Sequence, residues 1–164
     1  MALTNQATKI VSQQIWTPMQ KDEFWNINIL VMGYAWENFR GGFLTDTMML
    51  ASYNPTIGAV TFLSVPRDLY INYGEWRTGK INGMFWNKYL LHDDDWELAA
   101  ADVREKVGEI TGIEIPYYVM VDFDGFVEFV DAMGGVEVEV PYTLHDTLYP
   151  GPNDSYTTFH VDEG

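Results

Sequence analysis

One short stretch near the N-terminus restricts the possible folds more than any other feature of this sequence. Residues 27–32 are apolar at every position except Asn28, and the run ends at Gly33. A strand with one face in water alternates polar and apolar residues, whereas a run of this kind is typical of a central strand covered on both faces. The chain is therefore expected to build a sheet with other elements packed on each side.

Two further strands are predicted after this run, at residues 47–53 and 59–65. The segment between them, Asn54-Pro55-Thr56-Ile57-Gly58, has the composition of a turn. The two strands are therefore expected to form an antiparallel hairpin.

Two helices are predicted after the hairpin, at residues 81–91 and 96–111. The second has the clearer limits, because aspartates at 93–95 can cap its start and Gly112 can end it. Its apolar positions repeat at helical spacing, at Trp96, Ala99, Val103, Val107 and Ile110.

The last part of the chain is expected to hold a strand, a helix and another strand. Residues 116–121 are the first strand, and Asp124 is expected to cap a helix that ends at Gly134. Alternating valine and glutamate at residues 136–140 predict a half-exposed strand, and everything from Pro141 onward is expected to be loop. All the elements together indicate the α/β class, with a mixed central sheet flanked by helices.

A length of 164 residues fits one domain with its own core. We expect a linker at residues 1–23 and the domain at 24–164. No apolar run approaches the roughly 20 residues that cross a bilayer, and the first residues lack the pattern of a signal peptide, so the chain as given is expected to be soluble. The chain has no cysteine, which excludes disulfides and thiolate metal sites.

The net charge of −15 argues against nucleic acid as a partner, because a phosphate backbone needs a basic surface. An anionic ligand could bind only where some of the few basic residues gather. The hairpin predicts such a place: residues equally far from the turn near Thr56 face each other, so Asp46 and Arg67 are expected to meet at one end of the sheet. Gly33 reaches the same end if its strand runs antiparallel to the next.

Arg77 and Lys80 follow in a glycine-flanked stretch just before the first predicted helix. Basic side chains beside a helix N-terminus suit phosphate. Together with Arg67, and near Asp46, they form a candidate phosphate site. On the residues alone the alternative stays open that Asp46 and Arg67 form a plain cross-strand ion pair, with Arg77 and Lys80 in solvent.

Five short motifs, in this order, resemble those of the LytR-CpsA-Psr family, and together they span most of the chain. They are Thr45-Asp46-Thr47-Met48-Met49, Leu63-Ser64-Val65-Pro66-Arg67-Asp68, Lys80-Ile81-Asn82, Asp122-Phe123-Asp124-Gly125-Phe126 and Val130-Asp131-Ala132-Met133-Gly134-Gly135-Val136. The resemblance implies a central sheet between helices.

The resemblance also implies a reaction. Members of the family take a glycan linked through pyrophosphate to a polyprenyl lipid and transfer the glycan phosphate to peptidoglycan or another wall acceptor, outside the bacterial membrane to which they are anchored. Mg²⁺, or Mn²⁺, assists. By this resemblance Asp46 contacts the metal and Arg67 binds pyrophosphate, and these two are the candidate catalytic residues. The further candidates for substrate binding are Asp68, Lys80, Asn82, Arg77 and Arg40.

Three features depart from the family pattern. Ala35 stands where the family usually has a second aspartate, with Glu37 as a nearby substitute, and Leu44 stands where it often has an arginine, a role that Arg40 could take. A late pair of arginines is expected beyond the last residue, so the domain is expected to be incomplete at its C-terminus. These departures keep a second interpretation open, a module that binds lipid-linked pyrophosphate without turning it over.

An apolar groove for the polyprenyl chain is expected on the helices, although ordinary core packing competes for every candidate. The candidates are Phe85, Trp86, Tyr89, Leu90, Phe126, Phe129, Val130 and Met133. Aromatic residues that could stack on sugars are Trp25, Trp36, Trp76 and Tyr73. The histidines lack the spacing of a metal motif and are expected to be surface residues: His92, His145 and His160.

Overall fold

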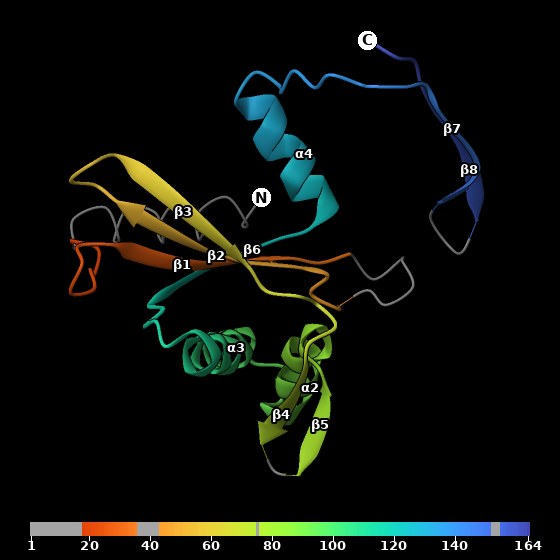
Figure 1. The fold of residues 1–164 in the computed structure, drawn as a ribbon. Coiled ribbons are helices and arrows are strands. Elements are labelled where there is room, and N and C mark those ends of the chain that lie inside the picture. The colour runs from red at the N-terminus through yellow and green to blue at the C-terminus, as the bar shows by residue number, and fades with distance from the viewer. Residues whose placement is uncertain (1–17, 36–42, 75, 152–154) are drawn as a thin grey trace, which may run out of the picture.

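A four-stranded sheet lies at the centre of the computed structural model, which describes residues 18–35, 43–74, 76–151 and 155–164 (Figure 1). Its strands are β1 (Ile27–Gly33), β2 (Thr47–Asn54), β3 (Ala59–Ser64) and β6 (Tyr117–Val121), in the order β3-β2-β1-β6. β1 pairs antiparallel with β2 and parallel with β6, so the sheet is mixed. The predicted fold class is confirmed.

The β2–β3 hairpin has the predicted register. Met49 pairs with Ser64, and Asn54 pairs with Ala59 at the turn. The side-chain oxygen of Asn54 accepts a hydrogen bond from the backbone N of Thr56 at 3.0 Å, which shapes the turn. A turn fixed in this way sets the pairing along both strands, including the residues just beyond their far ends.

Two helices cover one face of the sheet, below it in Figure 1: α2 (Met84–Leu91) and α3 (Trp96–Thr111). The 3-10 helix η1 (Ile81–Gly83) leads into α2. Asp95 caps α3 by accepting from the backbone N of Leu98 at 3.0 Å, and Gly112 ends it with a left-handed φ of 72°, as predicted. Ile110, expected on the buried stripe of α3, is exposed in its last turn. Buried apolar side chains fill the space between sheet and helices, among them Leu30, Met32, Met48, Leu50, Phe85, Val103 and Val107.

On the opposite face of the sheet lies α4 (Phe123–Ala132), so helices flank the sheet on both sides (Figure 1). Its cap is Asp122 and not the predicted Asp124. The Asp122 carboxylate accepts from the backbone N of Gly125 at 2.7 Å, because Asp122 keeps the extended backbone that follows β6, whereas Asp124 is already within the first turn. No residue of α4 is buried.

A small hairpin that the sequence patterns did not indicate connects the sheet to the helices. It consists of β4 (Tyr70–Gly74) and β5 (Arg77–Lys80), with a bulge between Asn72 and Gly74. β5 runs directly into η1, so the position of Lys80 is tied to the start of the helical layer.

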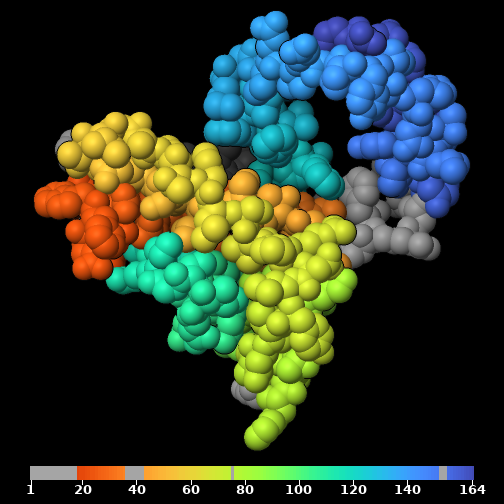
Figure 2. All heavy atoms as spheres, in the orientation of Figure 1, coloured from red at the N-terminus to blue at the C-terminus, as the bar shows by residue number. Residues whose placement is uncertain are grey.

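The C-terminal part differs most from the prediction. Residues after Pro141 were expected to be loop, but β7 (Leu144–Pro150) and β8 (Tyr156–Val161) form an antiparallel hairpin. Every residue of β7 is exposed, so the strand lacks the apolar alternation that would have marked it. In the space-filling view this hairpin stands apart from α4, with open space between them (Figure 2).

The strand predicted at residues 136–140 is absent: no residue of this stretch belongs to a strand. Within the described ranges, Val140 alone in this stretch makes a pair of backbone hydrogen bonds, with Gly164, at 2.8 and 3.2 Å. Alternating side chains favour an extended backbone, but a strand also needs a neighbour whose N–H and C=O groups pair with its own.

Residues 18–23 are the only described part of the expected linker, and Gln20 contacts the sheet by donating its backbone N–H to the Tyr117 hydroxyl at 2.6 Å. The boundary between linker and domain stays a prediction. Within the described ranges, no helix is long and apolar enough to cross a membrane.

Candidate functional site

The candidate site begins with an ion pair at one end of the β2–β3 hairpin. Asp46 directly precedes β2, and Arg67 follows the end of β3. The register continued beyond the strands brings them together, with Arg67 Nη1 at 3.2 Å from Asp46 Oδ1. Both side chains remain accessible, Arg67 at 55% and Asp46 at 44% exposure, so a ligand can reach them. The predicted meeting of these two residues is confirmed.

Asn82, which is buried in η1, holds this pair in place. Its side-chain amide donates to Asp46 Oδ1 at 3.1 Å, and its backbone N donates to the Arg67 carbonyl oxygen at 3.2 Å. Its own carbonyl oxygen accepts from the backbone N of Thr45 at 3.0 Å. One buried residue is thus bonded to both sides of the hairpin end.

Lys80 and Asp68 extend the cluster. Lys80 Nζ lies 2.5 Å from Asp68 Oδ1, and Arg67 Nε lies 3.8 Å from Asp68 Oδ2. The hydrogen bond and the charge of Lys80, and then the charge of Arg67, hold the pKa of the Asp68 carboxyl below its usual value. Two cations and two carboxylates therefore alternate along this exposed edge.

One of the described candidate residues is not brought into the cluster. Arg77 lies at the opposite end of β5 from Lys80, about 10 Å along an extended strand, and lines a small pocket with Lys88 and Asn87. Arg40 lies outside the described residues, as does Glu37. Arg67, Lys80, Asp46, Asp68 and Asn82 are the predicted residues that the structure brings together.

An apolar cavity of about 360 Å³ opens beside the cluster, between the ends of three strands and the start of α4. Gly33 is central to it, because it pairs with Thr47 on one side and Val121 on the other. A Cβ atom at Gly33 would lie 3.2 Å from the Thr47 Cβ, so the absence of a side chain keeps this junction open. The lining residues are Val31, Gly33, Tyr34, Ala35, Asp46, Thr47, Met49, Val121, Asp122, Phe123 and Phe126.

Asp46 belongs to both places: it lines the cavity and is paired with Arg67. Of the side chains predicted to line a groove, only Phe126 lines this cavity. Phe85 is buried in the core instead, and Trp86 stacks on Phe43 with ring centroids 4.5 Å apart. Sequence reasoning missed Met49 and Val121, although Val121 is the last residue of a predicted strand and such strand ends were a usable signal.

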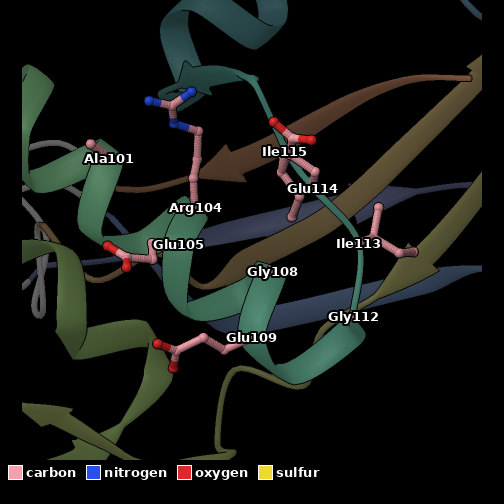
Figure 3. Close-up of a pocket in the computed structure, with 9 residues that line it drawn as sticks. All are labelled: Ala101, Arg104, Glu105, Gly108, Glu109, Gly112, Ile113, Glu114 and Ile115. Atoms are coloured by element: carbon pink, nitrogen blue, oxygen red, sulfur yellow. The ribbon is translucent and has the colours of Figure 1, made fainter. Parts of the chain in front are cut away.

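A second hollow, of about 530 Å³, lies between the last turns of α3 and the segment that leads to β6 (Figure 3). Its one basic side chain, Arg104, donates to the carbonyl oxygen of Pro116 and lies over the ring of Tyr118. Three glutamates, Glu105, Glu109 and Glu114, line the same hollow. The carboxylates repel an anion and the arginine is already engaged, so this hollow does not suit phosphate.

Comparison with known proteins gives a match to the LytR_cpsA_psr family over residues 2–164. Among curated proteins, the "Probable cell wall biosynthesis protein LcpB" of Corynebacterium glutamicum is 34% identical over 106 residues, which cover 63% of this chain and 22% of that protein. The "Polyisoprenyl-teichoic acid--peptidoglycan teichoic acid transferase TagU" of Oceanobacillus iheyensis is 34% identical over 115 residues, covering 68% of this chain and 33% of that protein. The chain thus matches no more than about a third of either relative.

Solved structures support the same fold. TagV of B. subtilis superimposes with a TM-score of 0.58 at 23% identity, over 86% of this chain and 53% of that one. The protein YwtF (TagT), solved with bound octaprenyl pyrophosphate lipid, gives a TM-score of 0.54 at 18% identity, over 88% of this chain and 56% of that one. At these identities the likeness concerns the fold alone.

Proposed function

Because this chain belongs to the LytR_cpsA_psr family, we propose that it carries the pyrophosphate site of a transferase. The proposed reaction moves a glycan phosphate from a polyprenyl-pyrophosphate carrier to peptidoglycan or another wall acceptor. One observation carries the proposal: Asp46 lies both in the charged cluster and in the wall of an apolar cavity. An anionic headgroup and an apolar chain could therefore be held side by side.

The cations of the cluster suit a pyrophosphate. Arg67 and Lys80 are each paired with a carboxylate that stays open to solvent, so phosphate oxygens can replace that partner without exposing a buried charge. The guanidinium of Arg67 can bind two phosphate oxygens at once, and Lys80 adds a compact charge beside it. Two such contacts also fix the orientation of the headgroup.

In the proposed reaction, an acceptor hydroxyl oxygen bonds to the glycan-bearing phosphorus. The bond from that phosphorus to the bridging oxygen breaks, the hydroxyl proton is released, and polyprenyl phosphate leaves. Arg67 and Lys80 neutralise charge on the transferred and leaving groups, which is the main contribution a protein makes to phosphoryl transfer. With water in place of the acceptor, the same site would act as a pyrophosphatase.

We propose that Mg²⁺, or Mn²⁺, assists through Asp46. The described residues contain no group of three or more His, Cys, Asp or Glu side chains suited to a metal ion, so no cage made by the protein alone is found there. Mg²⁺ in phosphate-handling sites takes one or two carboxylates and completes its shell with phosphate oxygens and water, and the accessible carboxylate of Asp46 fits that need. When bound there, the ion would add positive charge at the pyrophosphate.

A binding module without turnover is the second candidate. It is favoured by Ala35, which lines the cavity and has no oxygen in its side chain, at the position where the family pattern has an aspartate. Without that carboxylate the site retains the means to bind an anion but has fewer ligands for a metal. For either candidate we propose a location at the extracytoplasmic face of a bacterial membrane, where a lipid carrier meets the cell wall.

One assay separates the two candidates. The protein is incubated with a lipid-pyrophosphate glycan, peptidoglycan and Mg²⁺, while bound lipid, glycan transferred and polyprenyl phosphate released are all measured. Transfer that requires both acceptor and metal supports the transferase. Saturable binding with no product supports the module, and the absence of saturable binding contradicts both.

A further inference from the structure

The C-terminal hairpin brings together two histidines that the sequence patterns left apart. In the β7–β8 ladder His145 lies directly opposite His160. Their Nδ1 atoms are 3.2 Å apart, and the two rings cross at 72° with centroids 5.3 Å apart. Both were expected to be surface residues, and both are exposed, but the sequence patterns did not pair them.

The neighbouring carboxylate determines which nitrogen of His160 carries the proton. His160 Nε2 lies 3.1 Å from Asp162 Oδ1, and an ionised carboxylate can only accept, so Nε2 is the protonated nitrogen. The Nδ1 of the neutral ring then presents a lone pair toward His145. Histidines that bind metals are commonly oriented in this way, with the second ring nitrogen donating to a carboxylate.

The separation of the two Nδ1 atoms also fits a shared metal ion. Zinc binds imidazole nitrogen at about 2.0–2.1 Å with tetrahedral angles, which places two such nitrogens about 3.3 Å apart. The observed separation is 3.2 Å, so an ion could enter between the rings with little movement of the strands. The exposure of both residues leaves room for water as the remaining ligands.

We propose that His145 and His160 bind a divalent transition-metal ion, Zn²⁺ in the first instance, through their Nδ1 atoms, with Asp162 orienting His160. The site is distinct from Asp46 in position and in chemistry, because imidazole selects Zn²⁺, Ni²⁺ or Cu²⁺ and not Mg²⁺. Since no described cluster offers three or more protein ligands, water or a ligand from another molecule completes the shell.

The bound ion would act as a clamp across the hairpin. A two-stranded hairpin on its own is marginally stable in water, and every residue of β7 is exposed. The ladder is also interrupted by a register shift between Asp146 and Tyr149, next to the histidine pair. A metal bridge between opposite strands would fix the register at the open end of the hairpin.

The test is a calorimetric titration of the complete chain, freed of any histidine tag, with Zn²⁺, Ni²⁺ and Mg²⁺. The chain suits this test because it has no cysteine and only three histidines. We expect one Zn²⁺ per chain and no Mg²⁺ at this site. Asp162→Asn should weaken Zn²⁺ binding about tenfold, and His145→Ala or His160→Ala should weaken it further.

His92→Ala is the matched control, because His92 lies at the end of α2, away from the hairpin, and its Nε2 is 3.0 Å from Asp102 Oδ2. It should leave the Zn²⁺ affinity unchanged. Imidazole resonances in the unmodified protein provide a readout independent of any variant, and those of His145 and His160 should shift with added Zn²⁺. Unshifted resonances, or equal affinity in His145→Ala and the parent chain, would overturn the proposal and leave an ordinary cross-strand histidine pair.

Discussion

The side-chain amide of Asn82 donates to Asp46 Oδ1 across 3.1 Å, joining residues 36 positions apart in the chain. The same carboxylate oxygen receives Arg67 Nη1 at 3.2 Å. Since Asn82 is buried and Asp46 is accessible, the amide anchors an exposed carboxylate to the protein interior. Asn82 is therefore a positioning residue in the proposed site, and Asp46 and Arg67 are the residues that meet the ligand.

Replacing Asn82 by alanine should loosen Asp46. We expect the Mg²⁺ concentration needed for half-maximal activity to rise, with a loss of stability of about 1 kcal/mol from the missing side-chain hydrogen bond. Asn87→Ala is the control, since Asn87 donates its side-chain amide to the Gly83 carbonyl oxygen at a similar 3.2 Å, and in the described part of the chain it has no hydrogen bond to a site residue. Equal Mg²⁺ requirements in the two variants would show that Asn82 has only a structural role.

Arg67→Ala should weaken the binding of octaprenyl pyrophosphate at least about tenfold, or about 1.4 kcal/mol, because a charged contact with two phosphate oxygens is lost. The fold should persist, since the side chain is 55% exposed. Arg77→Ala removes the same charge from the far end of β5 and should change affinity little. Titration of both folded variants with octaprenyl pyrophosphate measures the two affinities. Equal affinities would show that Arg67 does not bind the pyrophosphate.

Asp46→Asn tests the metal role. If Asp46 binds Mg²⁺, metal-dependent turnover should fall far more than the melting temperature, because an exposed ion pair contributes about 1 kcal/mol or less to stability. Activity measured across Mg²⁺ concentrations and calorimetry on the same samples separate the two effects. A lowered melting temperature with an unchanged metal dependence would identify Asp46 as an ion-pair partner alone.

A partly buried charge cluster connects the two helices under the sheet. Lys88 of α2 lies 2.9 Å from Asp102 of α3, with side-chain exposures of only 16% and 26%. Lys88→Ala should cost about 2 kcal/mol, since it leaves a poorly solvated carboxylate without its main partner. Lys106→Ala, which breaks a pair with the exposed Glu109 on α3 itself, should cost about 0.5 kcal/mol or less. Urea denaturation of both variants measures the difference.

The same cluster predicts how stability responds to acid. Burial raises the pKa of the Asp102 carboxyl, but hydrogen bonds and charge from Lys88 and His92 outweigh this effect, so the pKa lies below its usual value of 3.8. A depressed pKa in the folded state stabilises the fold above the unfolded pKa, and this contribution is lost as the pH falls through the folded value. Below about pH 3.8, the free energy of unfolding should fall less steeply in Asp102→Asn than in the parent protein. Urea denaturation midpoints of both proteins between pH 2 and 6 measure this. Equal pH dependence in the two proteins would show that the Lys88–Asp102 pair does not contribute.

The exposed apolar side chains of α4 predict self-association. None of its residues is buried, and Phe126, Val127 and Phe129 are each more than half exposed. Neighbouring exposed aromatic side chains favour contacts between molecules. Light scattering should show a mass that rises with concentration, and Phe129→Ser, which lies outside the cavity lining, should reduce it. A concentration-independent monomer mass would contradict this expectation.

Much of the site was predictable because a hairpin turn fixes pairing on both sides of it. The turn at residues 54–58 was enough to place Asp46 opposite Arg67. The position of Arg77 was not predictable in this way, because residues 77–80 form the strand β5, which puts Arg77 and Lys80 at opposite ends. The histidine pair was missed for a related reason: β7 is exposed on both faces, so no hydrophobic pattern marks it as a strand.

The parallel pairing of β1 with β6 has a consequence for how this protein folds. Ile29 pairs with Tyr117, and all of β2 to α3 lies in the chain between them. The entropy lost in closing such a long loop must be overcome before the contacts between the two strands stabilise the fold. The large sequence separation therefore raises the contact order of the domain, and we expect a slow folding step. Since Gly33 and Val121 both line the cavity, the cavity can exist only once this distant pairing has formed.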